Sequence, residues 1–202
     1  MNAVSWRATS DFAMDAAPGE LGLVHDLMNT VSGGKPNRVD LLADLDSARA
    51  WLETSLNSLA AATKSPRVEI ELLADDLDGL RALRADLRHV AAMNHDGADP
   101  HSDGPLQSAT AGLQLNGDGT VVLRPRGSGA RQLTSLVLSV ILRAQLADTW
   151  RRVKVCRNPK CAAVFYDRSR NNSGVWHDVR VCGNAANLRA SRARRQAMTK
   201  KP

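Results

Sequence analysis

Apolar residues recur every three or four positions through most of the first 150 residues, which is the spacing of one face of an α-helix. Four segments show this pattern: residues 24–31, residues 46–56, the segment after Pro66, and residues 131–150. The stripes consist of Val24, Leu27, Met28 and Val31; Ala48, Trp51, Leu52 and Leu56; Leu73, Leu77, Leu80, Leu83, Leu87 and Val90; and Leu133, Leu136, Val137, Val140, Ile141 and Ala144. We interpret them as one helical core, with Asp46 as the N-cap of the second helix.

A β-hairpin is predicted before the last of these helices. Two β-favouring runs flank Asn-Gly-Asp-Gly within GLQLNGDGTVVL, residues 112–123. The preceding segment HDGADPHSDGP, residues 95–105, is rich in Gly, Pro, Asp and Ser and predicts a loop. Its histidines and aspartates lack a regular ligand spacing, so we favour a solvated loop over a metal site. The expected fold is mainly α with a small β-hairpin in an N-terminal domain of residues 1–150, followed by a small C-terminal module of residues 151–202.

The charge of the chain is divided unevenly between these two parts. Residues 151–202 contain 14 Lys or Arg and two acidic residues, Asp167 and Asp178, for a net charge of +12. The first 150 residues therefore hold 13 of the 27 basic and 19 of the 21 acidic residues, for a net charge of −6. Such a basic region suggests an anionic partner.

Membrane and secretory classes find no support in the composition. The hydrophobic share of 43% and the charged share of 24% are ordinary for a globular protein, and the 3% of aromatics leaves a core of Leu, Val and Ala. No segment approaches the roughly 20 apolar residues of a membrane span. The first residues lack the apolar run of a secretory signal, so we expect a cytoplasmic protein.

All three cysteines lie within CRNPKCAAVFYDRSRNNSGVWHDVRVCGN, residues 156–184. Four residues separate Cys156 from Cys161, fifteen separate Cys161 from His177, and four separate His177 from Cys182. Two close pairs at about this separation predict a tetrahedral zinc site. The alternative is a cluster of reduced cysteines with a surface histidine, but the short segment between the pairs has too few large apolar residues for a core of its own. Four ligands close the shell, so we interpret the metal as structural.

The motifs resemble those of CGNR zinc finger proteins of bacteria, in which an ABATE domain precedes the finger. CRNPKC, FYDRSRNNSGVWHDVRVCGN and LRASRARR carry the likeness of the finger, and LGLVHDLMNTVSGG, DLLADLDSARAWL and LQLNGDGTVVLRP that of the body. His177 stands where the family usually has cysteine, and Ala185 stands where the run Cys-Gly-Asn-Arg has its arginine. The family is regarded as one of stress-induced transcription regulators. The resemblance therefore implies DNA binding and a treble-clef-like finger, a β-hairpin plus a helix.

The basic module supplies candidate contacts to double-stranded DNA. Asn184 is a good N-cap, and the residues after it are rich in helix formers. Such a helix would place Arg189, Arg192 and Arg195 on one face, with Arg194 beside them and Leu188 on the inward side. The candidate nucleic-acid contacts are Arg168, Arg170, Asn171, Asn172, Arg189, Arg192, Arg194 and Arg195. A solvated basic tail is the alternative.

Three functional hypotheses follow from these patterns. In the first, the finger binds DNA for a transcription regulator, and the N-terminal domain senses a small-molecule effector or forms a homodimer. In the second, the finger binds an acidic protein partner. The third is an enzyme, which we disfavour because the body shows no spaced nucleophile and base, only His25, His89, His95 and His101.

Overall fold

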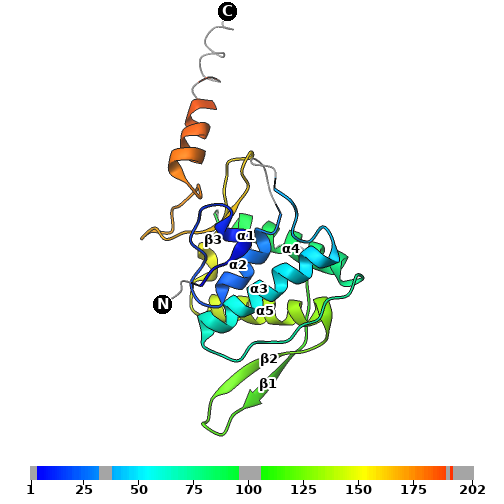
Figure 1. Ribbon diagram of the computed structural model, residues 1–202. Helices are drawn as coiled ribbons and strands as arrows, with labels where there is room; N and C mark the ends of the chain where they lie inside the picture. The colour runs from blue at the N-terminus through cyan, green and yellow to red at the C-terminus, as the bar shows by residue number, and fades with distance from the viewer. Residues whose placement is uncertain (1–3, 32–37, 96–105, 190–191, 193–202) are drawn as a thin grey trace, which may run out of the picture.

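Four helices, α2 to α5, form the body of the protein in the computed structural model, which describes residues 4–31, 38–95, 106–189 and 192 (Figure 1). The elements are α1 (Arg7–Ser10), α2 (Leu21–Met28), α3 (Leu45–Thr63), α4 (Asp76–Met93), β1 (Ala111–Leu115), β2 (Val121–Pro125), α5 (Gly129–Leu146), η1 (Trp150–Arg152), β3 (Val153–Val155), β4 (Val164–Tyr166) and η2 (Val179–Gly183). Residues 184–189 continue η2 as an α-helix, and residue 192 is helical too. The predicted fold class, mainly α with a hairpin and a small zinc-finger module, is confirmed.

Helix α2 lies at the centre of the body, and all of its residues are buried. It packs against α1, α3, α4, α5 and β4. Trp6 lies directly on Gly22, where a Cβ atom would overlap the indole ring. Glycine is therefore required at this position even though it is a weak helix former, because only a bare backbone lets the indole approach so closely.

The helix boundaries differ from the predicted ones where polar side chains cap the backbone. The N-cap of α3 is Asp44 and not Asp46, because the Asp44 carboxylate accepts a hydrogen bond from the Ser47 amide at 2.8 Å. Asp46 instead lies in the first turn, where a negative charge suits the helix dipole.

The third apolar stripe also begins later than predicted. Helix α4 starts at Asp76, whose carboxylate accepts a hydrogen bond from the Leu73 amide at 2.8 Å. Leu73 is consequently 60% exposed, while Leu72 next to it is buried. Val31 and Trp150 likewise lie outside α2 and α5, although Trp150 is buried in η1.

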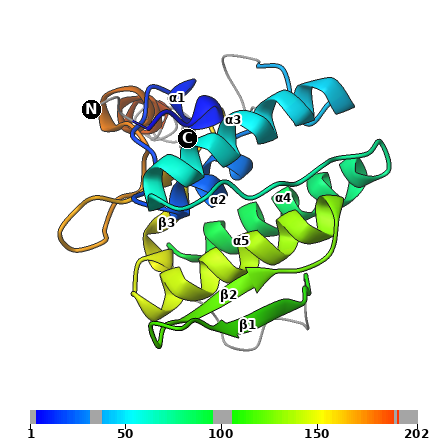
Figure 2. The same cartoon turned by 60° about the horizontal axis from the view of Figure 1, so that its bottom comes forward.

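The predicted hairpin is present as β1 and β2, which pair antiparallel with Leu113 opposite Leu123. Residues 116–120 form the turn, and the Asn116 amide donates to the Thr120 carbonyl at 2.8 Å. Figure 2 shows the hairpin lying alongside α5, where it contacts that helix.

A second antiparallel hairpin, β3 with β4, joins the C-terminal module to the body. Val153 and Val164 are fully buried in the same core as the body helices. Asn29, the C-cap of α2, pairs with the Val164 backbone, donating to its carbonyl at 3.0 Å and accepting from its amide at 2.9 Å. His25 lies 2.8 Å from the same carbonyl. The strands of the finger therefore share the core of the body.

His95 belongs to this interface and not to a solvated loop. Its Nε2 lies 2.6 Å from the Val155 carbonyl, and its ring lies against that of Phe165. The rest of the predicted loop, residues 96–105 with His101, lies outside the described residues. Within the part of the chain that the structure describes, no helix is long and apolar enough to cross a membrane.

Candidate metal centre

The four predicted zinc ligands lie together in the structure. The ligand atoms of Cys156, Cys161, His177 and Cys182 all lie within 4.8 Å of one another. The Nδ1 atom of His177 is 3.2 Å from the Cys161 sulfur and 3.5 Å from the Cys182 sulfur. A tetrahedral zinc ion with ordinary bond lengths separates sulfur and nitrogen ligands by about 3.5 Å. Both the donor set and its spacing therefore fit zinc, bound through Nδ1 of the histidine.

The first ligand pair lies on a tight turn built around Asn158. Its carbonyl accepts hydrogen bonds from the amides of Cys161 at 2.8 Å and Ala162 at 3.0 Å. Its side-chain amide donates to the sulfur of Cys182 at 3.2 Å, and its side-chain oxygen accepts from Arg189 at 3.0 Å. Asn158 thus joins the two ligand pairs and the helix that follows them. Asn158 is not among the predicted site residues, although its position between two predicted zinc ligands was a usable signal.

The pKa shifts of the three thiols indicate why a cation is needed to hold all three as thiolates. A hydrogen bond from Cys161 lowers the pKa of Cys156 to about 4, and the same bond raises the pKa of Cys161 above its usual range. Burial raises the pKa of Cys182. The packed thiols therefore do not all become thiolates by themselves, whereas a divalent cation among them stabilises all three charges.

An N-terminal segment covers the cluster. Phe12 and Met14 pack against the buried cysteines, as does Trp176 from the loop between the ligand pairs. Arg168 reinforces this cover by donating to the Ala16 carbonyl at 2.7 Å. The metal centre thus has its apolar shell from both ends of the chain, which no local pattern in the sequence could reveal.

A buried ion pair fixes the loop between the ligand pairs. Lys154 and Asp167 are 2% and 3% exposed, and their charged atoms lie 2.8 Å apart. Lys154 also donates to the Asn172 carbonyl at 2.6 Å. Burial alone would raise the pKa of Asp167, but hydrogen bonds from Lys154, Ser169 and Gly174 outweigh it and hold the pKa at about 2. The carboxylate is consequently charged and paired at neutral pH.

Some candidate nucleic-acid residues of this loop are exposed, and others make hydrogen bonds that hold the loop in place. Arg170 and Asn171 are exposed. Arg168 is exposed as well, but its guanidinium binds Ala16. Asn172 has a left-handed backbone with φ of 51°, and its side chain donates to the Arg151 carbonyl at 3.3 Å, which gives it a structural role in the loop.

The final helix begins before the last cysteine, at Val179, and not after it as predicted. It also turns a different face to solvent. The N-cap is Asp178 and not Asn184, because the Asp178 carboxylate accepts from the Val181 amide at 3.0 Å. Arg189 turns back to Asn158, while Leu188 is 59% exposed and does not lie on the inward side. Arg192 is exposed, and Arg194 and Arg195 lie outside the described residues.

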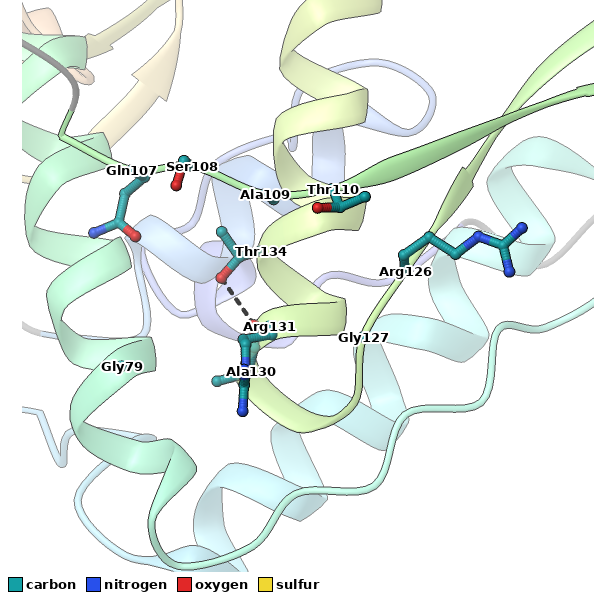
Figure 3. Close-up of a pocket in the computed structure, with 10 residues that line it drawn as sticks. All are labelled: Gly79, Gln107, Ser108, Ala109, Thr110, Arg126, Gly127, Ala130, Arg131 and Thr134. Atoms are coloured by element: carbon teal, nitrogen blue, oxygen red, sulfur yellow. Dashed lines mark hydrogen bonds between the residues drawn. The ribbon is translucent and has the colours of Figure 1, made fainter.

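A separate pocket of about 610 Å³ lies on the body between α4, α5 and the segment before β1 (Figure 3). Its lining is Gly79, Gln107, Ser108, Ala109, Thr110, Arg126, Gly127, Ala130, Arg131 and Thr134. The Ala130 amide at the start of α5 donates to Asp76 at 2.8 Å, and the Thr134 hydroxyl donates to the Ala130 carbonyl at 2.8 Å. Arg131 contributes a positive charge to the lining, whereas the side chain of Arg126 extends away from the other lining residues (Figure 3). The volume is in the range of small-molecule sites.

The buried histidine of the body has a structural environment. His25 is fully buried; its Nδ1 accepts from the Ala17 amide at 3.0 Å, and its Nε2 faces the Val164 carbonyl. Burial lowers its pKa to about 4, so the ring is neutral and donates to that carbonyl through Nε2.

Two family models match the chain, and they meet where β3 begins. The CGNR zinc finger model matches residues 152–195. The ABATE model, described as "Putative stress-induced transcription regulator", matches residues 21–153, which is more than half of the chain. No curated protein matches. The matches confirm the resemblance and, with the four clustered donors, the assignment of one structural zinc ion. The two matching models describe a regulator and a zinc finger and not an enzyme.

Proposed function

Because this chain belongs to the ABATE family and carries a CGNR zinc finger after that domain, we propose that it is a transcription regulator that binds double-stranded DNA through the finger. In this proposal residues 1–150 sense or dimerise, residues 151–202 bind DNA, and no catalytic step takes part. Such a protein would act in the cytoplasm, where bacterial DNA lies.

The observation that carries this proposal is the position of Cys182 at the start of the final helix. Cys182 is buried in the metal cluster, and the helix that continues from it points away from the body (Figure 1). Zinc at this site would fix the origin and direction of a helix that lies within a segment of net charge +12. A rigid helix in a basic environment suits a DNA groove and its phosphates.

The pocket on the body supports the sensing role. Arg131 on its lining favours a small acidic ligand, which would be the effector. A shift of the thermal midpoint by such a ligand, and its loss in Arg131→Ala, would test this part of the proposal separately from DNA binding.

Exposed apolar residues on the finger favour a second candidate function, the binding of an acidic protein partner. Val179, Val181 and Leu188 are 69%, 64% and 59% exposed beside basic residues. The two functions differ in their dependence on nucleotide sequence, because a docking module for a protein would not enrich one duplex motif.

The deciding experiment is selection from a random pool of duplexes by the full-length, zinc-loaded protein. We expect enrichment of one motif and an affinity that falls steeply with salt. The matched control is His177→Ala, which removes one zinc ligand and leaves the charge of the basic segment unchanged. Equal enrichment by the control, or no duplex binding by the parent, would contradict the proposal.

A further inference from the structure

The final helix turns a small, uncharged face to solvent. Asn184, Asn187 and Leu188 are all exposed, and they lie three and four residues apart, on one side of a helix. Arg189, the neighbour of Leu188, is turned away from this side because its guanidinium binds Asn158 at 3.0 Å. The outward face therefore presents two amides and an isobutyl group.

These side chains match the edges of one kind of base pair. An asparagine side chain can bind adenine with two hydrogen bonds, donating from its NH2 group to N7 and accepting at its oxygen from the N6 amino group, and an apolar side chain contacts the methyl group of thymine. Guanine, by contrast, is read mainly by Arg or Lys, and the arginine adjacent to this face is held by Asn158.

Charge on both sides of the face would position it in the major groove. Arg180 is exposed before it, and Arg192 is exposed one turn beyond Leu188. Residues 184–189 span about 8 Å of helix, which is the rise of a little more than two base pairs. Val181, also exposed at 64%, extends the apolar contact toward the start of the helix.

We propose that Asn184, Asn187 and Leu188 read A·T base pairs in the major groove, with the asparagines on adenine and Leu188 on a thymine methyl group, while Arg180 and Arg192 hold phosphates. This inference rests on the proposed DNA binding and specifies its target. It assigns sequence reading to the uncharged side chains of the helix and positioning to its arginines.

Three duplexes of about 20 base pairs, or two helical turns, test the proposal by fluorescence anisotropy with the full-length, zinc-loaded protein. They are alternating A·T, the same sequence with deoxyuridine for thymidine, and alternating G·C. We expect A·T to bind about tenfold tighter than G·C. Removal of the methyl groups should weaken binding about fourfold for each methyl contacted. The C5 methyl lies in the major groove, so this loss would not come from minor-groove shape.

Variants locate the effect on the helix face. Leu188→Ala should bind the thymidine and deoxyuridine duplexes equally, and Asn187→Ala should lose most of the preference for A·T over G·C. The matched controls are Leu146→Ala on α5, where the leucine is 81% exposed, and Asn57→Ala on α3, also exposed; both should behave as the parent.

The outcomes separate this inference from the function beneath it. If the parent binds all three duplexes equally and Leu188→Ala changes nothing, the A·T reading is wrong, while DNA binding stands. If the parent binds none of these duplexes and none of a random pool, both proposals are wrong.

Discussion

Removal of the zinc ion is expected to unfold only part of the C-terminal module. The turn around Asn158 and the segment from His177 onward should lose their structure, whereas strands β3 and β4 should stay folded on the body. Chelation from the reduced protein leaves three thiols and an imidazole within 4.8 Å of one another without the cation that stabilises the thiolates. The turn around Asn158 and the segment from His177 onward depend on that cation for their positions. The strands β3 and β4 have contacts of their own.

The contacts of β3 and β4 with the body determine how much more stable these strands should be than the final helix once zinc is removed. Five hydrogen bonds hold Val153, Val155 and Val164 to side chains of α2 and the end of α4. At about 1 kcal/mol each they contribute about 5 kcal/mol, and two fully buried valines add about 4 kcal/mol. The helix after Cys182 has the bond from Arg189 to Asn158 and the Asp178 cap, together about 3 kcal/mol. Asn158 itself lies in the turn that needs zinc.

Amide hydrogen exchange measures this difference residue by residue. The Val164 amide donates to Asn29, and it should keep its protection to within about tenfold after chelation. The amides of Cys161 and Cys182 donate to carbonyls of the metal site and should lose about 100-fold or more. A 100-fold loss of protection corresponds to about 2.8 kcal/mol of opening free energy, which is a minor part of the 10 kcal/mol or more that structural zinc supplies.

The result that would refute this reasoning is an equal loss of protection at Val164 and Cys182. It would mean that the strands also depend on zinc and that their hydrogen bonds to α2 contribute little without it. Chelator saturated with zinc beforehand is the control, and readdition of zinc should restore the protection of Cys182.

Four further results are expected. His177→Cys should keep zinc, because it restores the usual ligand of the family, whereas His177→Ala should lose at least about tenfold in affinity in a chelator competition; equal affinities would exclude His177 as a ligand. Arg192→Ala should reduce the salt slope of duplex binding by about one without changing the melting temperature, while Arg189→Ala should destabilise the finger by about 1.5–3 kcal/mol; the reverse pattern would contradict the assigned roles. Lys154→Met should cost about 3–5 kcal/mol in urea unfolding by leaving Asp167 buried and unpaired, and Asp167→Leu in the same chain should recover most of it; a cost below about 1 kcal/mol would show that the pair is unimportant. Because its folded pKa of about 2 lies below the unfolded 3.8, Asp167 contributes about 2 kcal/mol that is present above pH 4 and is lost as the pH falls through 2, so the urea midpoint of Asp167→Asn should fall less over this range than that of the parent.

The zinc ligands could be predicted from the sequence because their information is local. Each pair lies within one turn, and turn chemistry and ligand type are both visible in a few residues. The helical stripes were visible for the same reason, since each needs only neighbours three or four residues apart. The N-cap of α3 could not be chosen from the sequence, because Asp44 and Asp46 are both suitable residue types. The extended backbone at Asp44 makes it the N-cap.

The orientation of the final helix could not be predicted, because a residue far away in the chain sets it. Arg189 belongs to the arginine face by spacing alone, yet its partner Asn158 lies 31 residues earlier. The contacts of Val164 with His25 and Asn29 span 139 and 135 residues. Such pairs leave no periodic signal in a single sequence, so the inward and outward sides of the finger emerge only in the fold.

The shared core of the two parts has a consequence for how such proteins evolve. The two family models meet at residues 152–153, and this is where a gene fusion or exchange would join the parts. A new finger attached there must bring a β4 strand whose backbone matches the polar groups that His25 and Asn29 offer from α2. Exchange of fingers between family members is therefore constrained by two residues that lie 139 and 135 residues before Val164 in the chain. Chimeras that carry these two residues over from the finger donor should be recovered folded more often than chimeras joined at the boundary alone.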